Sequence, residues 1–320
     1  MALSTSRFDK TWLSYLQRYQ GLVGLGILLA VAFVLDREHF YLPTNLANIL
    51  NQLAVPGILA VGMTFVILTG GIDLSVGSLL GLVNCVSATW LVNGAGLGPT
   101  LLYSLGIGVL VGVVLGGLVS VTKLQPFVVT LAAMVSLRGL AYVYTNNGTV
   151  SGSAISAKLG FLIQPILGIP TSAWIMLILT AATAILLWKT VFGRQLYALG
   201  GNPEAARYAG LPMVRLRIGA YAINGLCVAL AALIFTARNA NGDPSAGTSF
   251  ELDAITAVVV GGTSLLGGYG GVLGTFVGAL FIVCLNVLLI LKGVNTYVGM
   301  GWKGIIILIA VYLQNLGRRT

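Results

Sequence analysis

Charged residues are scarce in this sequence. Lys, Arg, Asp and Glu make up 8% of the 320 residues, whereas about 25% is usual for a soluble domain. Apolar residues make up 57% of the chain, and the mean hydropathy is +0.97. This composition excludes a soluble enzyme, a nucleic-acid-binding protein and a disordered regulator, although the isoelectric point is about 9.6. It is typical of a polytopic membrane protein, whose net charge of +9 reflects which loops face the cytoplasm.

Residues that carry chemistry are equally few. The three cysteines (Cys85, Cys227 and Cys284) lie in apolar runs without CxxC spacing, so we interpret them as small buried hydrophobic residues. His39 is the single histidine, which excludes a histidine-based zinc site and disfavours a Ser-His-Asp triad. The sequence contains no Gly-Lys dipeptide, so it has no Walker A loop for ATP. We therefore expect no metal, no cofactor and no enzymatic activity.

Apolar runs of the length that crosses a bilayer, about 20 residues, divide the chain into approximately ten spans. We expect an all-α fold with a single transmembrane domain over 1–320. A signal peptide ending near 30–32 is the less favoured interpretation of the first run, because many spans follow it. The expected spans are 20–35, 52–69, 74–92, 100–121, 126–145, 172–188, 218–237, 253–267, 272–291 and 300–316.

The basic residues set the orientation. With both termini in the cytoplasm, eleven Lys and Arg residues fall inside and four outside, as the positive-inside rule requires. We therefore expect cytoplasmic termini, a short cytoplasmic tail over 1–19 and a long cytoplasmic loop over 189–217. Glycines also recur every four residues, at 108, 112 and 116 and at 270, 274 and 278. Ordinary close helix packing is the favoured interpretation, and packing around a pathway is the alternative.

Two glycine-rich breaks interrupt the apolar runs. The pattern GGxxLxxG occurs at 70–77 and again 191 residues later at 261–268. We favour a tight hairpin at the first break, with Asp73 capping the next helix. The alternative is a broken helix whose polar backbone lines a cavity, as in transporters. The candidate break and pathway residues are Gly70, Gly71, Asp73, Ser75, Gly261, Gly262, Thr263 and Ser264.

The loop over 189–217 contains one short helix with both ends marked. Asn202 is a candidate N-cap, Pro203 fits the first helical position, and Glu204 suits the positive end of the helix dipole. Gly210 ends the helix. Two turns are too few to persist alone in water, so this helix must pack against a partner. A protein partner is favoured over lipid headgroups, because the helix has a smooth alanine face and few bulky apolar residues.

Four segments resemble the permease subunits of bacterial ABC importers, in the branch with the ribose, xylose, arabinose and galactoside permeases. They are AVGMTFVILTGGIDLSVGSLLGL (60–82), LRGLAYVYTN (137–146), FGRQLYALGGNPEAARYAGL (192–211) and FELDAITAVVVGGTSLLGGYGGVLGTFVGAL (250–280). The resemblance implies a ten-helix permease, two permease chains per transporter, a separate ATPase subunit and a periplasmic binding protein. It also implies that 192–211 docks on the ATPase. The matching residues are Asn202, Pro203, Glu204, Ala205, Ala206, Arg207 and Gly210.

Other polar residues have less specific interpretations. Arg138 lies deep within its span and has a structural role as the favoured interpretation, and Lys303 is expected to extend toward the membrane surface. Asn84, Asn224 and Asn286 are interpreted as clamps between helices rather than ligands of a substrate. The polar segment 238–253 is a candidate landing surface for the binding protein. Its possible docking charges are Arg238, Glu251 and Asp253.

The predicted function is import of a monosaccharide by alternating access across the bacterial inner membrane. Three alternatives remain. The importer could carry another solute, such as autoinducer-2, a polyol or a branched-chain amino acid. A secondary transporter would need acids in mid-membrane, and Asp73 is the one serious candidate. A membrane-embedded enzyme would need a nucleophile and base, and no such pair is visible.

Overall fold

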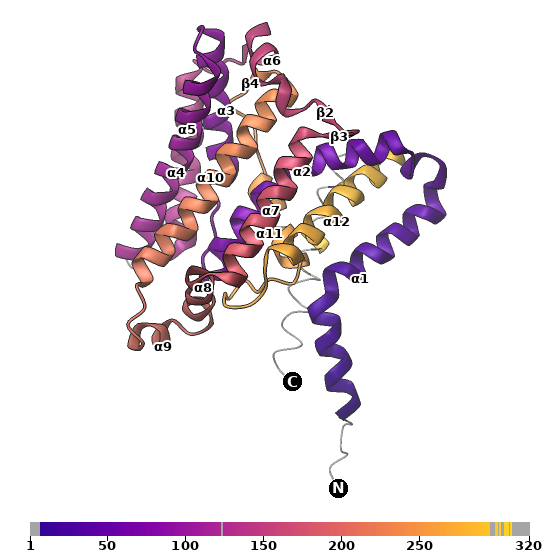
Figure 1. Ribbon diagram of the computed structural model, residues 1–320, viewed down its shortest axis with the longest axis vertical. Coiled ribbons are helices and arrows are strands. Elements are labelled where there is room, and N and C mark those ends of the chain that lie inside the picture. The colour runs from indigo at the N-terminus through magenta and orange to yellow at the C-terminus, as the bar shows by residue number, and fades with distance from the viewer. Residues whose placement is uncertain are drawn as a thin grey trace.

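The computed structural model is a bundle of helices (Figure 1) and describes residues 7–122, 124–294, 298–299, 301, 304–306 and 308. The first helices are α1 (Arg7–Phe40), α2 (Pro43–Leu68), α3 (Val76–Val92), α4 (Leu97–Val121), α5 (Pro126–Tyr144) and α6 (Ser153–Leu159). They are followed by α7 (Thr171–Lys189), α8 (Val191–Gly201), α9 (Pro203–Tyr208), α10 (Met213–Asn239), α11 (Phe250–Val260) and α12 (Val272–Leu291). A short 3-10 turn covers Gly160–Leu162.

Two-residue strands complete the described elements. Strand β1 (Val150–Ser151) pairs with β4 (Asn241–Gly242), and β2 (Pro165–Ile166) pairs with β3 (Ile169–Pro170), both antiparallel. These strands lie in the connections between helices, so the predicted all-α class is confirmed. In Figure 1 the helix α6 and strand β4 lie at one end of the bundle, and α8 and α9 lie at the other. We call these the α6 end and the α9 end.

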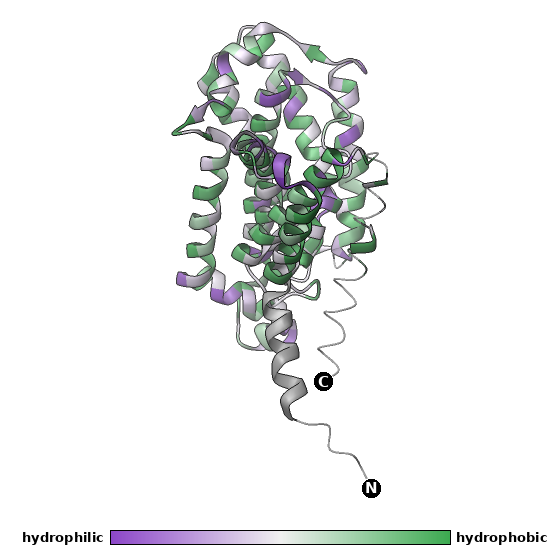
Figure 2. Ribbon diagram, turned by 90° about the vertical axis from the view of Figure 1, so that its right-hand side faces the viewer, coloured by the Kyte–Doolittle hydropathy of each residue, from purple (hydrophilic) through white to green (hydrophobic). Residues whose placement is uncertain are grey.

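Within the described residues, six helices are long and apolar enough to cross a membrane. They are α2, α4, α5, α7, α10 and α12, which coincide with six of the ten expected spans. Figure 2 shows hydrophobic residues concentrated on the helices in the body of the bundle. The expected span 74–92 forms the shorter helix α3, of 17 residues. The expected span 300–316 falls largely outside the described residues.

Two helix boundaries differ from those of the expected spans. Helix α1 begins at Arg7, within the expected tail 1–19, and continues without a break through the first span to Phe40; the cytoplasmic location of this tail stays a prediction. The expected span 253–267 stops at Val260 after 11 residues. It stops there because Gly262 adopts φ +89° and the chain turns. Apolar residues continue beyond that point, but they belong to a loop rather than to a helix.

Helix α2 occupies the centre of the bundle. In the most apolar stretch of α2, 78% of the residues are buried, whereas in that of α5 only 17% are buried. It contacts α7, α10, α11 and α12, and its side chains contribute much of the main hydrophobic core. Helix α5 lies at the edge of the bundle in Figure 1. Most of its apolar surface is therefore available to lipid or to another chain.

Most glycines spaced by four residues serve helix packing within this chain, whereas Gly270 lies in the loop before α12 at φ +118° and its expected place on a helix face was wrong. A Cβ atom on Gly108 or Gly112 would overlap the backbone of α10, at Gly225 and Tyr221 respectively. A Cβ atom on Gly116 would lie 2.7 Å from Ile218 Cα. On α12, Gly278 faces the carbonyl of Ala257 on α11 in the same way. Close helix packing, the favoured interpretation of these spacings, is what these contacts show.

Candidate functional site

The short helix α9 forms as its end signals predict. Asn202 Oδ1 accepts a hydrogen bond from the Ala205 amide at 2.9 Å, and Pro203 is the first helical residue. At the other end Gly210 adopts φ +72°. The Gly210 amide donates to the Arg207 carbonyl at 3.0 Å, and the next amide donates to Ala206 at 3.1 Å. This pair of bonds is the Schellman motif.

Most of α9 faces away from the bundle. Ala206 is its one buried residue, and the helix exposes Glu204 and Arg207. Tyr208 is 90% exposed, which is unusual for so large an aromatic side chain. Aromatic and arginine side chains on such a surface are the residue types that anchor protein interfaces. The geometry therefore suits docking, although the role of this helix remains a prediction.

Helix α8 holds α9 against the core, and the sequence did not predict it. Thr190 Oγ1 accepts a hydrogen bond from the Gly193 amide at 3.2 Å and so caps the helix. Leu196 and Leu199 are fully buried in a cluster that also contains Phe65 and Leu68 of α2. The signal that could have revealed α8 was this leucine spacing. It was hidden by glycines at three of the eleven positions, since glycine disfavours helix.

The first break follows α2. Gly70 adopts φ +78°, and the amides of Gly70 and Gly71 donate to the carbonyls of Ile67 and Val66 in another Schellman motif. The chain then runs without helical structure to Ser75, and α3 begins at Val76.

Asp73 lies in this break and joins it to α10. Its Oδ1 accepts from the Ser75 amide at 2.9 Å and from Ser75 Oγ at 2.6 Å. Its Oδ2 accepts from Asn224 Nδ2 at 2.8 Å. The predicted capping role needs correction, because the N-cap position belongs to Ser75 and Asp73 closes the turn before it. Asp73 is 3% exposed, so its hydrogen bonds replace water.

The second break, after α11, ends its helix in the same way. Gly262 is the left-handed residue, its amide donates to Val259, and the Thr263 amide donates to Val258. The left-handed glycine is the first of the pair at 70–71 and the second of the pair at 261–262. The two copies of GGxxLxxG therefore share a helix ending, shifted by one residue. Ser264 lies beyond the turn, where its amide donates to the Tyr269 carbonyl at 3.0 Å.

The two breaks meet at the α9 end. The Gly268 amide donates to the Leu68 carbonyl at 3.1 Å, which ties the loop after α11 to the end of α2. Gly200 of α8 contacts both the end of α2 and the loop after α11, because a Cβ atom on Gly200 would overlap the Leu68 oxygen and lie 2.5 Å from the Gly268 nitrogen. Gly267 packs against Gly70. We call these four residues, Gly70, Gly200, Gly267 and Gly268, the glycine junction.

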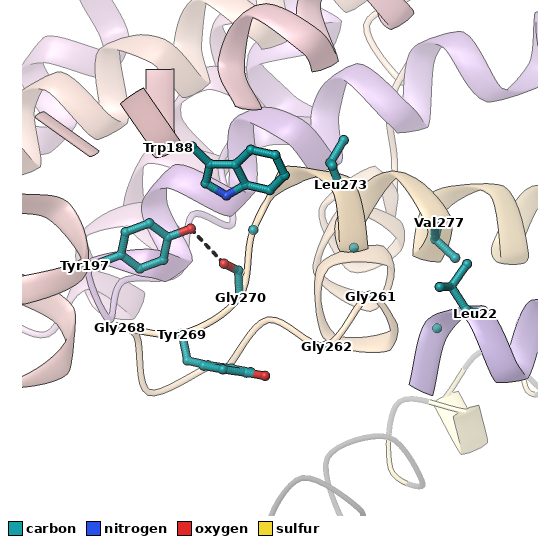
Figure 3. A pocket seen from close by; sticks show the side chains of 13 residues that line it. Leu22, Trp188, Tyr197, Gly261, Gly262, Gly268, Tyr269, Gly270, Leu273 and Val277 are labelled. Atoms are coloured by element: carbon teal, nitrogen blue, oxygen red, sulfur yellow. Dashed lines mark hydrogen bonds between the residues drawn. The ribbon is translucent and has the colours of Figure 1, made fainter. Parts of the chain in front are cut away.

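A cavity of about 510 Å³ adjoins the glycine junction (Figure 3). It is bounded by α1, α7, α8, α12 and the loop after α11. Trp188 and Tyr269 are aromatic residues of its wall. Tyr197 Oη donates to the Gly270 carbonyl at 2.7 Å and so fixes the loop to α8. Any displacement of α8 would therefore reach this cavity through both the tyrosine and the junction.

Toward the α6 end, the segment 240–249 folds inward against α3. Asn84 of α3 donates to the Asn241 carbonyl and to Thr236 Oγ1, each at 2.8 Å, and accepts from the Asp243 amide at 2.7 Å. Arg138 Nη1 donates to the carbonyls of Pro244 and Ala246, at 2.5 and 2.6 Å. Asn84 and Asn224 are thus clamps between segments, as predicted. Asn286 is partly buried, and Lys303 lies outside the described residues.

The three predicted docking charges lie at the end of α10 and at the start of α11. Arg238, in the last turn of α10, lies with its guanidinium carbon 5.7 Å from the centre of the Phe235 ring. Glu251 and Asp253 begin α11. Glu251 turns toward α3, where a Cβ atom on Gly77 would overlap its Oε2 atom. Their contact with a binding protein remains a prediction.

Comparison with known proteins places the chain among permeases. The family model described as "branched-chain amino acid transport system / permease component" matches residues 45–311. The chain is 43% identical to the ribose import permease protein of Escherichia coli (strain K12) over 311 residues, covering 96% of each. It is 44% identical to the ribose import permease protein of Bacillus subtilis (strain 168), with 93% of each covered. The xylose transport system permease protein of Escherichia coli (strain K12) is 35% identical, with 86% covered. No solved structure was found to match.

Proposed function

Because the chain belongs to the family of branched-chain amino acid transport system permease components, we propose that it is the permease subunit of an ABC importer for a ribose- or xylose-type monosaccharide. The observation that carries the sugar assignment is the identity of 43–44% with two ribose permeases over nearly the whole chain. The chain is a multi-pass membrane protein and a transport protein rather than an enzyme.

The energy-supplying partner in this proposal is an ABC ATPase that docks on α9. The support comes from the geometry of that helix, which is capped at both ends, carried by the buried α8 and exposed on nearly all its residues. A helix of six residues is too short to be stable on its own in water. Its exposed Glu204, Arg207 and Tyr208 offer a carboxylate, a guanidinium and an aromatic anchor to a groove on the ATPase.

The α9 end then faces the cytoplasm. The basic residues between the end of α7 and the start of α10 support this orientation, because positively charged loops are retained on that side. These residues are Lys189, Arg194, Arg207, Arg215 and Arg217. Helix α1 begins at the same end (Figure 1), which agrees with a cytoplasmic N-terminus. The ten-helix topology, with α3 and α11 as shortened spans beside the two breaks, belongs to the same proposal.

In the transport cycle, the glycine junction is the route from the ATPase to the helices. A displacement of α8 by the ATPase presses on the end of α2 through Gly200 and on the loop after α11 through Gly268. Both breaks, at 70–75 and 261–264, therefore move with α8, and the helices that follow them rearrange around the pathway. A second permease chain completes the pathway, and a periplasmic binding protein delivers the sugar at the α6 end, with Arg238, Glu251 and Asp253 as candidate contacts.

The test is reconstitution of the permease with its ATPase and binding protein in proteoliposomes. We expect ATP-dependent uptake of radiolabelled D-ribose or D-xylose. Uptake of a branched-chain amino acid or autoinducer-2 instead would change the substrate class while retaining the importer. Sugar uptake driven by a proton gradient without the ATPase would contradict the importer and favour a secondary transporter.

The docking role of α9 is tested by substitution of its exposed side chains. Glu204→Lys and Tyr208→Ala should each lower co-purification of the ATPase by about tenfold or more, because interface anchors of this type contribute on the order of 2 kcal/mol. The matched control is Leu167→Ala, since Leu167 is also 90% exposed but lies between β2 and β3, in the connection between α6 and α7. Undiminished ATPase binding by both α9 variants would show that docking occurs elsewhere.

A further inference from the structure

Two buried side-chain oxygens on α10 have no hydrogen-bond partner. They are Tyr221 Oη and Asn224 Oδ1, and each of these residues is 1% exposed. Within the described part of the chain, only Thr89 Oγ1 and Ser104 Oγ share this condition. A buried polar atom without a partner costs free energy, because it has lost its hydrogen bonds to water. Two such atoms within one turn of a helix therefore call for an explanation.

Both oxygens lie where α10 meets α2 and the first break. Asn224 holds Asp73 of the break through its Nδ2 atom, which donates to Asp73 Oδ2 at 2.8 Å. The Asn224 Oδ1 atom packs against Gly62 of α2, where a Cβ atom would lie 2.7 Å away. Tyr221 Oη packs against Gly71 of the break, where a Cβ atom would lie 2.9 Å away. The two glycines thus leave room for the oxygens without offering a side-chain partner.

The hydroxyl groups of the break are already used as donors, but one acceptor position remains. Ser75 donates its amide and its hydroxyl to Asp73 Oδ1, and Thr69 Oγ1 donates to a carbonyl of α2 at 2.7 Å. Each oxygen of a carboxylate can accept two hydrogen bonds. The Asp73 Oδ2 atom accepts one, from Asn224. The hydroxyl of Tyr221 therefore has an acceptor in the same break, which it does not reach in this conformation.

The spacing of the two side chains on α10 sets the size of the movement that would join them to Asp73 in turn. Tyr221 and Asn224 are three residues apart, so they are neighbours on the surface of the helix. At 1.5 Å per residue, their positions differ by about 4.5 Å along the helix axis. A slide of the break along α10 by this distance or less would carry Asp73 from one side chain to the other. Packed elements in proteins switch between discrete arrangements by shifts of this size.

The contacts of α10 and of the break show which of the two would move. The backbone of α10 is held against α4 at Tyr221, because a Cβ atom on Gly112 would overlap the Tyr221 carbonyl. The break begins at Gly70, which belongs to the glycine junction and packs against Gly267. In the proposed transport cycle, a displacement of α8 therefore reaches the break, while α10 stays with α4.

We propose that Asp73 exchanges hydrogen-bond partners during transport, from Asn224 in this conformation to Tyr221 in a second one. This inference rests on the proposed import function and adds to it the residues that switch between the two conformations. The Tyr221 hydroxyl has no partner here because it bonds to Asp73 only after the break has moved. Its burial without a partner raises the free energy of the present conformation and so keeps the second conformation accessible.

The test is Tyr221→Phe, which removes the hydroxyl and keeps the ring. The melting temperature of the purified variant in mixed micelles should equal or exceed that of the wild type, because the lost hydroxyl makes no bond in this conformation. In proteoliposomes with the ATPase and the binding protein, D-ribose uptake and ATP hydrolysis should each fall by about tenfold, because the second conformation loses a hydrogen bond to a carboxylate. A purely structural role would move stability and transport in the same direction.

Two further variants complete the comparison. The matched control is Ser104→Ala, which removes another buried hydroxyl without a partner, on α4. This variant should be at least as stable as the wild type and should transport at the wild-type rate. Asn224→Ala removes the bond that Asp73 accepts from α10 in the present conformation, so its melting temperature should fall below that of the wild type. Tyr221 and Asn224, neighbours on one helix, should thus affect stability with opposite signs.

Several outcomes would contradict the exchange. A Tyr221→Phe variant less stable than the wild type would show that the hydroxyl has a partner in this conformation, such as an ordered water. Undiminished uptake and ATP hydrolysis by Tyr221→Phe would show that no second partner is needed. Loss of transport by Ser104→Ala as well would attribute the effect to added stability alone. If the wild type carries neither D-ribose nor D-xylose, the proposed function is wrong, and melting temperature and ATP hydrolysis then decide whether the exchange occurs.

Discussion

At the scale of single residues, the tightest contacts in this permease involve glycine. Gly200 of α8 has no room for a side chain, because the Leu68 carbonyl and the Gly268 amide lie against it. The adjacent Gly201 has nothing within 4 Å of the position of a Cβ atom. Two neighbouring glycines in one helix thus differ in contact while sharing the same helix propensity.

This pair gives a matched test of the glycine junction. Gly200→Ala should abolish most ATP-driven uptake while the chain still inserts and remains folded, because the added methyl group forces α8 away from both breaks. Gly201→Ala should transport at the wild-type rate. Uptake in proteoliposomes measures the first effect, and size-exclusion chromatography of the purified chain checks its folding. Equal uptake by the two variants would remove the junction from the coupling route.

Residue-scale contacts over long sequence separations could not be predicted. The sequence marked Asp73 as a residue at a helix break, but its partner Asn224 lies 151 positions later on α10. The same holds for Arg138, whose bonds go to carbonyls more than 100 residues away. A backbone carbonyl carries no residue signature, so no pattern in the sequence points to it. Local hydrogen bonds such as that of Asn202 to Ala205 were predictable, because their geometry depends only on spacing.

At the scale of helices, α4 and α10 pack closely against each other through small residues rather than through large side chains. In lipid, the burial of apolar surface gives little net gain between helices, so close backbone packing matters more. Gly112 of α4 faces the backbone of Tyr221 and Ala222, while Gly117 on the same helix faces open space.

Substitutions at these two positions should therefore diverge. Gly112→Ala should destabilise the folded protein by about 1–3 kcal/mol, the usual cost of forcing extra volume into a packed contact. Gly117→Ala should be neutral or slightly stabilising, since alanine is the better helix former. Denaturation of the purified permease in mixed micelles measures both. A Gly112→Ala variant as stable as the wild type would mean that the helices separate without cost.

The end of a helix could be predicted when the residues that determine it are adjacent in the sequence. The caps of α9 come from a few adjacent residues, and they formed as expected. The predicted end of α11 was wrong. Leu265 and Leu266 continue the apolar run in the sequence, but the turn that ends the helix depends on which of two adjacent glycines adopts the left-handed conformation. The short strand pairs were not predicted, since a pair of residues has no periodicity.

At the scale of the whole molecule, the first and last described long helices are joined by charge. Asp36 of α1 accepts from His39 Nδ1 at 2.7 Å and from Lys292, just after α12, at 3.0 Å. Asp36 lies beyond the expected span 20–35. The hydrogen bond from His39, and next that from Lys292, holds the pKa of Asp36 below its usual value.

This depressed pKa fixes the sign of a pH effect. The contribution of Asp36 to stability is present in full above the pKa of the unfolded chain, which is about 3.9, and is lost as the pH falls through the lower folded value. The melting temperature of the purified permease should therefore fall more steeply below about pH 4 in the wild type than in Asp36→Asn. The exposed neighbour Glu38 provides the control variant Glu38→Gln. If the melting temperature depended on pH in the same way for the wild type and for Asp36→Asn, the contacts of Asp36 with His39 and Lys292 would not contribute to stability.

The placement of α2 has a consequence for how the chain is made. The helices that surround it, α7, α10, α11 and α12, are all synthesised later, so α2 must first reside in lipid or beside the insertion machinery. Its sequence allows this, because its central and later turns are apolar on every side. Thr64 bonds the Ala60 carbonyl of its own helix at 2.8 Å, and its second bond, to Thr275, forms only once α12 exists. The centre of the finished transporter is thus a segment that is stable in the bilayer while it waits for the rest of the protein.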